Sequence, residues 1–301
     1  MIPQDFLDQI NPDRYIVPVG EKFHWQDYDP ADTAGLKSKA EAQELLAAGI
    51  KKLAAYQDVL YAQNIYALLI IFQAMDAAGK DSTIKHVMSG INPQGCQVYS
   101  FKAPSAEELD HDFLWRANRA LPERGCIGIF NRSYYEEVLV VRVHPDLLNR
   151  QQLPPETKTK HIWKERFEDI NHYERYLTRN GILILKFFLN ISKAEQKKRF
   201  LERISRPEKN WKFSIDDVRD RAHWDNYRAA YADVFRHTST DWAPWHIIPA
   251  NRKWFARLMV AHFIYQKLAS LNLHYPIVSE AHKEQLLEAK ALLENEPDDE
   301  E

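Results

Sequence analysis

The stretch Ala67-Leu-Leu-Ile-Ile-Phe-Gln-Ala-Met-Asp-Ala-Ala-Gly-Lys-Asp-Ser82 indicates the fold class of this chain. It opens with a continuous apolar run of strand length, Ala67 to Phe72, and a helical pattern follows over residues 80–89. The loop between them has the spacing of a phosphate-binding loop, Gly-x-x-x-x-Gly-Lys-Ser/Thr, with Ala74 in place of the first glycine and Asp81 in place of the hydroxyl residue. Because ligands of α/β proteins bind beyond the carboxyl ends of the strands, we expect a binding site at this turn.

The rest of the chain alternates strand-length and helical patterns. Further apolar runs stand at residues 98–101, 126–130, 182–189 and 245–248. Helical patterns stand at 38–61, 107–120, 158–179, 193–204, 216–235 and 252–270, with one more after residue 275. Strands that are buried on both faces and alternate with helices predict a three-layer α/β fold around a five-stranded, mostly parallel sheet.

Length and composition favour a single globular domain. The 301 residues are 45% hydrophobic and 28% charged, and no low-complexity linker divides them. We expect one domain over residues 1–301, with an N-terminal arm and helix over about 1–62, a lid over about 203–235 and an acidic tail at 294–301. No apolar run reaches the roughly 18 residues of a membrane span, and the amino terminus carries no signal-like pattern. The prediction is a cytoplasmic protein with no membrane partner.

Several common site types are not supported by the residues present. The nine glycines form no Gly-x-Gly-x-x-Gly turn, which argues against a dinucleotide-binding site. Cys96 and Cys126 lie far apart in sequence, so they form no Cys-x-x-Cys motif. His86, His144 and His161 have no second ligand at metal-binding spacing, and we interpret them as packed or surface histidines.

The turn after the first strand contains the groups that phosphate binding needs. Backbone N–H groups gather there at the start of a helix, on Ala77, Ala78, Gly79, Lys80, Asp81 and Ser82. Gly79 permits a close approach, and Lys80 adds a full positive charge. Asp76 places a carboxylate beside the phosphate site, which is favourable chiefly if a hard cation such as Mg²⁺, or Mn²⁺ in its place, lies between them. The alternative interpretation is an ordinary turn with Lys80 in solvent.

The strand at 126–130 ends in a second polar group, Asn131 and Arg132, with Glu136 one helical turn further on. In phosphate-loop proteins the strand beside the loop strand ends in an acidic residue that reaches Mg²⁺. Asn131 occupies that place, either as a neutral oxygen ligand or as the holder of a metal-bound water, so Asp76 and Asn131 are the predicted metal site. Arg132 is suited to phosphate oxygens. Glu136 either faces the metal, orients the acceptor or pairs with Arg132, and a plain surface pair is the alternative for both residues.

A basic stretch between two helices predicts the lid. Arg203, Arg206, Lys209 and Lys212 precede a helix start at Ser214, and residues 158–212 hold fifteen basic against seven acidic side chains. Lys102 and Arg116 add positive charge at the exit of the second strand. The alternative is a solvated charge run. The formal net charge of −3 conceals this track, because residues 294–301 contain six acidic and no basic side chains.

These residues together resemble a known family, polyphosphate kinase family 2. The resemblance rests on the following motifs: Gln73-Ala-Met-Asp-Ala-Ala-Gly-Lys-Asp81, Asn92-Pro-Gln-Gly-Cys96, Phe101-Lys-Ala-Pro104, His111-Asp-Phe-Leu-Trp-Arg116, Phe130-Asn-Arg-Ser133, Lys209-Asn-Trp-Lys-Phe-Ser214 and Ile248-Pro-Ala250. It extends from about Arg14 to about Leu271. It departs from the family pattern at Ala74, Tyr134 and Arg206, where the family often has Gly, His and an acidic residue.

The resemblance implies a thymidylate-kinase-like phosphate-loop fold with a helical lid, and Mg²⁺-dependent phosphoryl transfer from inorganic polyphosphate to ADP and AMP. It implies roles for Asp76, Lys80, Asn131, Arg132 and Glu136 in catalysis. It implies phosphate binding by the loop residues together with Lys102, Arg116, Arg132, Arg203, Lys209 and Lys212. The expected partners are polyphosphate and adenine or guanine nucleotides, not nucleic acid, in a homodimer or homotetramer. Two alternatives stay open here: an ATP-dependent nucleotide kinase, and a non-catalytic binder of polyphosphate or nucleic acid.

Overall fold

The computed structural model describes residues 11–20, 23–211 and 213–296 of the chain. Its centre is a five-stranded sheet of order β2-β3-β1-β4-β5 in which every neighbouring pair is parallel, as predicted. The strands are β1 (Ala67–Gln73), β2 (Cys96–Ser100), β3 (Ile127–Asn131), β4 (Ile182–Asn190) and β5 (Trp245–Pro249). All five runs expected from the sequence are confirmed, with ends displaced by no more than two residues.

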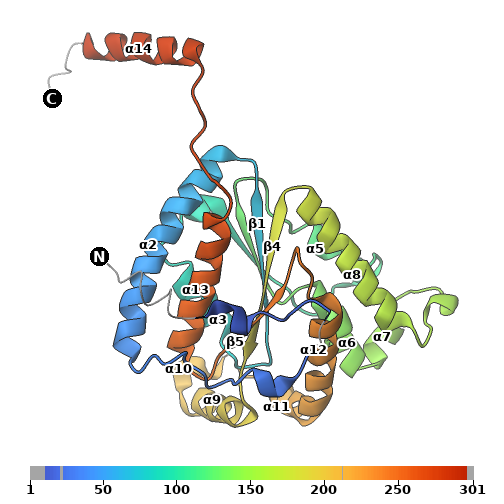
Figure 1. The fold of residues 1–301 in the computed structure, drawn as a ribbon. Helices are drawn as coiled ribbons and strands as arrows, with labels where there is room; N and C mark the ends of the chain where they lie inside the picture. Colours follow the sequence, from blue (N-terminus) through green and yellow to red (C-terminus); the bar gives the residue numbers. More distant parts are fainter. Residues whose placement is uncertain (1–10, 21–22, 212, 297–301) are drawn as a thin grey trace.

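Helices cover both faces of the sheet and complete the three layers (Figure 1). One face carries α2 (Lys39–Gln63), α3 (Lys80–Val87) and α13 (Lys253–Ala269). The other carries α8 (Ile162–Arg179) and α12 (Trp224–Thr238). The central strand β1 is buried along its whole length, because it is covered on both faces and paired on both edges.

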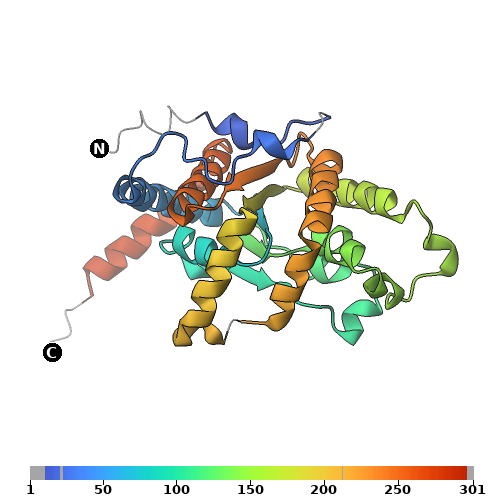
Figure 2. The same ribbon diagram turned by 90° about the horizontal axis from the view of Figure 1, so that it is seen from below.

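The remaining elements are mostly short and lie around the edges of the sheet. The helices are α4 (Ala106–Leu109), α5 (Trp115–Asn118), α6 (Val140–Val143), α7 (Asp146–Asn149), α9 (Lys193–Ser205), α10 (Pro207–Asn210), α11 (Ile215–Asp220) and α14 (Glu280–Glu294). The 3₁₀ turns are η1 (Pro12–Tyr15), η2 (Trp25–Asp27), η3 (Pro93–Gly95), η4 (Tyr134–Val138), η5 (Pro155–Thr157) and η6 (Arg221–His223). Seen from below, α9 and α12 cross the carboxyl end of the sheet (Figure 2).

Two long helices expected from the sequence are broken in the structure. The pattern at 107–120 forms α4 and α5, and the Asp112 carboxylate between them accepts the N–H of Leu114. Short acidic side chains bond the backbone in this way and compete with helix formation. The pattern at 216–235 forms α11, η6 and α12. Since α12 is largely buried in the core, only residues 203–223 keep the charged, exposed character predicted for the lid; we call this stretch the lid segment.

The edges and ends of the molecule differ from its centre. Strand β2 was expected to be buried on both faces, but it forms a sheet edge and Val98 and Tyr99 are about half exposed. The described part of the N-terminal arm lies against β5 through the N–H of Val17, which donates to Trp245 O. Helix α14 confirms the expected last helix, projects away from the body (Figure 1) and has no buried residue. Most of the acidic tail lies outside the described residues. Among the helices described here, none is long and apolar enough to cross a membrane.

Candidate active site

The phosphate-binding loop forms between β1 and α3, as predicted from its spacing. The apolar strand ends at Gln73, and the first residue of the helix is Lys80. Gly79 has φ +108° and Ala77 has φ +59°, so the loop makes two left-handed turns before the helix begins. A Cβ at Gly79 would lie 3.3 Å from Ser82 Oγ. The position therefore requires glycine for its conformation and for the space around it.

Lys80 lies against the loop that precedes it. Its Nζ donates to Ala74 O at 3.2 Å, which is a neutral acceptor. Desolvation lowers the pKa of Lys80, and the nearby Arg132 charge lowers it further, while Asp76 and Glu136 oppose both effects. A phosphate oxygen would offer this ammonium group a charged acceptor, and charge-assisted hydrogen bonds are about twice as strong as neutral ones.

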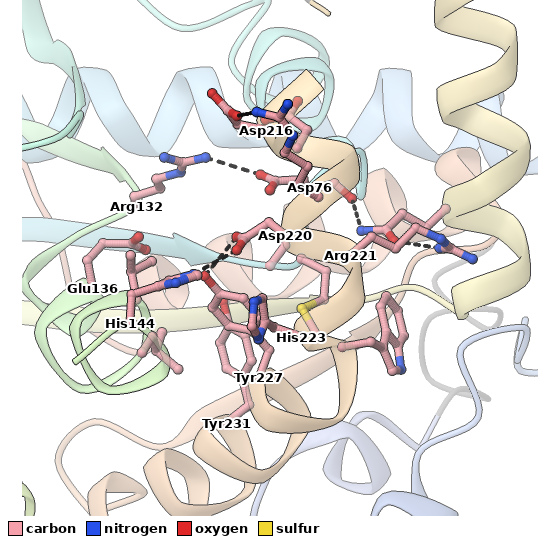
Figure 3. A pocket seen from close by; sticks show the side chains of 18 residues that line it. Asp76, Arg132, Glu136, His144, Asp216, Asp220, Arg221, His223, Tyr227 and Tyr231 are labelled. Atoms are coloured by element: carbon pink, nitrogen blue, oxygen red, sulfur yellow. Dashed lines mark hydrogen bonds and ion pairs between the residues drawn. The ribbon is translucent and has the colours of Figure 1, made fainter. Parts of the chain in front are cut away.

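Arg132 faces the loop from the end of β3. Its backbone N–H donates to Phe72 O at 3.0 Å, which extends the β1–β3 ladder by one residue, and its φ of +64° then turns the chain. Its Nη2 donates to Asp76 Oδ1 at 3.1 Å (Figure 3). The Arg132–Glu136 surface pair considered from the sequence is thus replaced by an ion pair across the loop.

Asn131 and Asp76, the predicted metal ligands, have different partners in the structure. Asn131 Nδ2 donates to Asp81 Oδ1 at 2.9 Å, whereas Asp76 accepts from Arg132. Throughout the described part of the chain, no group of three His, Cys, Asp or Glu is arranged to hold a metal ion. Their assignment as metal ligands stays a prediction.

Two cavities meet at Arg132 and Glu136. The first, which we call the loop cavity, has a volume of about 460 Å³ and lies between the phosphate loop and the lid segment (Figure 3). The second, the aromatic cavity, has a volume of about 240 Å³ and is walled by Phe101 and Phe113. Glu136 lines both, and burial raises its pKa, although the charges of Arg132 and Lys80 oppose that change. One carboxylate and one guanidinium therefore stand at the junction.

Lys102 and Arg116 come together on the aromatic cavity, as their predicted position at the exit of β2 suggested. Arg116 Nη1 donates to Lys102 O at 2.8 Å, and the guanidinium lies 5.3 Å from the centre of the Phe101 ring. An ion pair joins Arg116 Nη1 to Glu108 Oε2 at 3.6 Å. The cavity combines apolar walls with charged groups of both signs, among them Lys102 and Arg116.

The basic residues of the lid segment are engaged with acidic neighbours. Arg203 donates to Asp217 Oδ2 at 3.3 Å, which brings the start of α11 to the loop cavity. Lys209 donates to Glu202 Oε1 at 2.7 Å, and Arg206 bonds the same carboxylate at 3.2 Å. Lys212 lies outside the described residues. The predicted charge track exists, with internal partners that a polyanion would have to replace.

Several residues of the site were missed by sequence reasoning. His144 was interpreted as packed or exposed, yet it lines the loop cavity and bonds Asp220 Oδ1 at 2.7 Å. Tyr227 donates to the other oxygen of Asp220 at 2.8 Å. On α9, Gln196 and Arg199 are buried and contact the phosphate loop. Their signal in the sequence is helical phase, because Gln196, Arg199 and the apolar Phe200 fall on one face.

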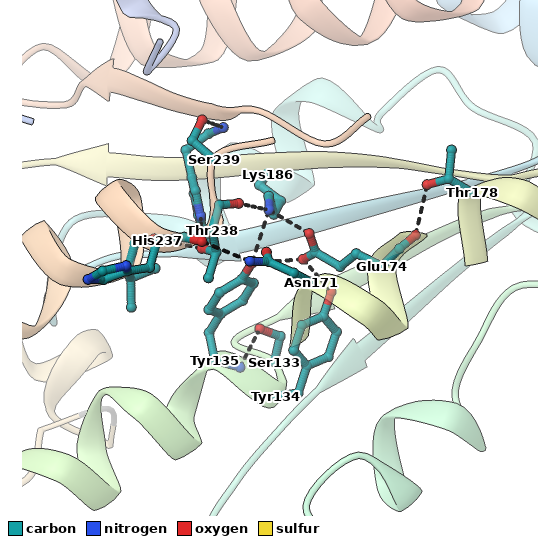
Figure 4. Close-up of polar contacts among 12 residues, drawn as sticks. Ser133, Tyr134, Tyr135, Asn171, Glu174, Thr178, Lys186, His237, Thr238 and Ser239 are labelled. Atoms are coloured by element: carbon teal, nitrogen blue, oxygen red, sulfur yellow. Dashed lines mark hydrogen bonds and ion pairs between the residues drawn. The ribbon is translucent and has the colours of Figure 1, made fainter. Parts of the chain in front are cut away.

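A group of polar side chains beneath the site holds η4, which follows Arg132 and carries Glu136; we call it the buried network (Figure 4). Lys186 of β4 donates to Glu174 Oε2 at 2.6 Å, to Thr238 O at 2.7 Å and to Tyr135 OH at 3.0 Å. Tyr134 and Tyr135 donate to Glu174 Oε1 at 2.9 and 2.8 Å. The departure at Tyr134 therefore lies in the core, where this side chain also borders the aromatic cavity.

The fold and the site together define the class of protein. A parallel sheet whose first strand leads into a lysine-bearing phosphate loop at the start of a helix is the arrangement of phosphate-loop kinases. Comparison with known proteins gives the family. The family model described as Polyphosphate kinase 2 matches residues 36–275, and the chain belongs to this family.

Individual relatives agree over nearly the whole chain. The ADP-polyphosphate phosphotransferase of Rhodopseudomonas palustris is 49% identical over 95% of this chain and 99% of its own length. The AMP/ADP-polyphosphate phosphotransferase of Meiothermus ruber is 43% identical over 87% and 95%. The crystal structure of Polyphosphate Kinase 2 from Arthrobacter aurescens TC1 has a TM-score of 0.82 and 41% identity, covering 91% of this chain and 95% of that one.

Proposed function

We propose that this protein transfers the terminal phosphoryl group of inorganic polyphosphate to ADP, forming ATP, and to AMP, forming ADP. The observation that carries the proposal is the junction of two cavities at Arg132 and Glu136, both of which lie close enough to Lys80 of the phosphate loop to interact with its charge. The relatives named above carry the same activities in their names. The reaction is reversible in principle.

Each cavity suits one substrate. We assign the loop cavity to the polyphosphate chain, because it adjoins the phosphate loop and is lined by Arg132, Arg219 and Arg221. Five carboxylates also line it, so the phosphates must replace them as partners of these arginines or be bridged to them by a cation. The aromatic cavity suits a nucleoside, because ligand pockets are mostly apolar with a few polar groups that fix orientation. Lys102 and Arg116 then face the phosphates of the nucleotide. In this arrangement the donor and acceptor phosphates meet beside Arg132.

The chemistry needs positioning and charge more than proton transfer. The terminal phosphate of a nucleotide is already ionised, so no general base is required. Lys80 and the loop amides hold the phosphoryl group that moves, and Arg132 stabilises charge on its equatorial oxygens. Glu136 adds negative charge beside Arg132 at the junction, without a direct bond to it. The ion pair with Asp76 holds the Arg132 guanidinium in position before the substrates bind.

We propose Mg²⁺ as the cofactor, with Asp76 as its protein ligand and Asn131 holding a water of its shell. Mg²⁺ usually keeps several waters and is bound through one or two carboxylates plus substrate phosphates, so a single loop carboxylate fits it. After burial, the charge of Asp76 is the next cause of the raised pKa of Asp217, and such carboxylate repulsion is relieved by a cation. When bound, the ion neutralises charge on the phosphates. Mn²⁺ is proposed as a substitute.

The test is formation of ATP from ADP, polyphosphate and Mg²⁺ by the purified protein, followed by luminescence. We expect ATP to form, and Lys80→Ala to lower the rate by about 10²-fold or more, as for removal of a principal charge-stabilising group. Lys283→Ala, on the exposed helix α14, is the matched control and should retain the wild-type rate. An absolute requirement for ATP as donor would instead indicate the nucleotide kinase, and salt-sensitive binding without turnover would indicate a binding protein.

The finer properties belong to the same proposal. AMP is assigned as a second acceptor because the motif Asn131-Arg132-Ser133-Tyr134-Tyr135-Glu136 resembles the subgroup that accepts both nucleotides. Guanine nucleotides are proposed as weaker substrates, a cytoplasmic location is kept, and the assembly is proposed to be a homodimer or homotetramer. Substrate competition assays test the choice of acceptor nucleotide, and light scattering tests the assembly.

A further inference from the structure

Three successive carbonyl groups of the phosphate loop are bound by side chains of one helix, α9. Gln196 Nε2 donates to Asp76 O at 3.0 Å. Arg199 Nη1 donates to Ala77 O at 3.1 Å and to Ala78 O at 2.6 Å. The two side chains are only 3% and 6% exposed, so these bonds form in the protein interior. The loop is therefore attached along one side to α9.

The attachment determines where the loop amides point. In a planar trans peptide the N–H is directed opposite to the C=O of the same unit. Since the carbonyls of Asp76 and Ala78 face α9, the N–H groups of Ala77 and Gly79 are turned away from it. An anion site built from backbone N–H groups depends on this orientation.

Arg199 acts on the loop without donors left for phosphate. Its Nε donates to Glu195 Oε1 at 2.9 Å, and its Nη2 donates to Ala250 O at 2.6 Å and Asn251 O at 3.2 Å. With the two loop carbonyls, these contacts use all five N–H groups of the guanidinium. Arg199 thus ties the loop to the end of β5, which belongs to the rigid body of the protein.

Gln196 ties the loop to the lid segment instead. Its Oε1 accepts from Arg221 Nη1 at 2.7 Å (Figure 3). The same nitrogen donates to Lys193 O at 2.8 Å. Arg221 directly follows α11 in the lid segment. The amide of Gln196 consequently stands between a lid arginine and the carbonyl of Asp76, and each of its two ends has one partner.

We infer that Gln196 is a positioning residue that couples the lid segment to the phosphate loop, with Arg199 as the fixed anchor of that loop; the inference rests on the proposed phosphoryl transfer. When the lid segment changes its partners around polyphosphate, Arg221 transmits the change through Gln196 to the peptide that follows Asp76. The loop amides and the Asp76 carboxylate respond together, while Arg199 limits the movement to that peptide.

The test is a double-mutant cycle on the coupling. Gln196→Met keeps the volume and removes both bonds, and Arg221→Met removes the lid partner. We expect each single variant to raise the KM for polyphosphate by about tenfold, the equivalent of one or two hydrogen bonds, and the double variant to be no worse than either one. Gln266→Met, on the exposed face of α13, is the matched control and should leave KM unchanged.

A second variant distinguishes coupling from loss of stability. Gln196→Glu retains an acceptor for Arg221 but cannot donate to Asp76 O in its ionised form. If coupling through both ends is the function, its KM for polyphosphate rises as in Gln196→Met although its melting temperature stays near that of the wild type. Strictly multiplicative effects in the cycle, or a wild-type KM in Gln196→Glu, would overturn the inference. Failure of the wild type itself to form ATP would refute the proposed function instead.

Discussion

The protein contains two groups of charged side chains around its proposed active site, and they differ in their exposure to solvent. An exposed charge can exchange its partner for water or an ion, whereas a buried charge depends on the partners that the fold provides. In the buried network, Lys186 and Glu174 are fully buried and surrounded by Tyr134, Tyr135 and Thr238. Beside the start of the lid segment, Glu202 of α9 is shared by Lys209 and Arg206, and all three side chains are between one third and one half exposed; we call these residues the lid cluster. Water and ions can replace any member of the lid cluster, whereas nothing replaces a member of the buried network.

The difference shows what each group contributes to the site. A buried charge that loses its partner is strongly destabilising, so the buried network has one arrangement and fixes η4 behind Arg132. Exposed pairs contribute about 0–1 kcal/mol each, so the lid cluster can exchange its internal carboxylates for phosphate oxygens at little cost. Ion pairs of the same chemical kind therefore fix the position of η4 in the buried network and exchange partners readily in the lid cluster.

The largest effect is expected when the buried network loses one charge. Lys186→Met should lower the free energy of unfolding by about 3–5 kcal/mol, because Glu174 is left buried without a counter-ion. Burial lowers the pKa of Lys186 and the charge of Glu174 opposes this change, so the Glu174 carboxylate is what favours the charged form of the buried lysine. Denaturant unfolding measures the change.

The matched control is the exposed pair Lys164–Glu168 on α8, which is separated by 3.7 Å. Lys164→Met should change stability by less than about 0.5 kcal/mol. The double variant Lys186→Met with Glu174→Gln should recover part of the loss, since it removes both charges. Equal effects of Lys186→Met and Lys164→Met would contradict the comparison.

The next effect concerns pH. His246 bonds the carbonyl of Lys186 at 3.1 Å, and burial lowers its pKa from 6.5 to about 4. Below pH 6.5 the unfolded chain binds a proton at His246, whereas the folded chain binds it only below about pH 4. The free energy of unfolding therefore falls as the pH is lowered from 6.5 to 4. At pH 5 the loss from this residue should be about 2 kcal/mol.

The measurement compares unfolding at pH 7 and pH 5 for the wild type, His246→Asn and the exposed control His86→Asn. Asparagine retains a donor for the Lys186 carbonyl but does not titrate, so the loss between the two pH values should shrink in His246→Asn only. An unchanged loss in that variant would mean that other groups cause the acid sensitivity.

A smaller effect should follow when the lid cluster loses its acid. The hydrogen bond from Lys209 is the main cause of the lowered pKa of Glu202, so the carboxylate is charged and competes with phosphate. Glu202→Gln should lower the KM for polyphosphate about two- to fivefold at low salt, and the gain should vanish at high salt because exposed charges are screened. Glu284→Gln on α14 is the control. A raised KM in Glu202→Gln would show that the cluster is needed intact.

The smallest effect is expected for Arg206→Ala. Arg206 pairs with Glu202 and Glu208 on the surface, and removing it should leave the melting temperature close to that of the wild type, because solvent and salt screen exposed pairs. A thermal melt at two salt concentrations is sufficient to test it. A drop in melting temperature as large as that of Lys186→Met would show that the lid cluster stabilises the fold as the buried network does, and would contradict the comparison.

Much of the fold could be predicted because its signals are local. Apolar runs of strand length and helical spacing located five strands and most of the helices, and the loop spacing located Lys80 and Gly79. The failures are where side chains bond the backbone or where position in the sheet matters. Asp112 interrupts a helical pattern, and β2 is exposed because it forms an edge, which no local pattern records.

The site was predictable for residues next to a strand end and not for those that reach it from elsewhere. Asp76, Lys80 and Arg132 follow β1 and β3, so the parallel topology brings them together. Gln196 and Arg199 come from α9, which is distant in sequence, and their roles depend on which way its face turns. His144 follows the short helix α6, and its role depends on the folding back of Asp220 against it.

By itself, the sequence determined the class of fold, the phosphate loop and the family, because these depend on the order and spacing of residues along the chain. Only the tertiary structure decided which charges are fixed and which are exchangeable. Lys186 lies in a strand and Lys209 in a short helix, and nothing in the local sequence distinguishes their environments. In the structure Lys186 is buried beneath the sheet, whereas Lys209 is partly exposed in the lid segment. The strength of an ion pair depends on the solvent around it, and packing alone sets that.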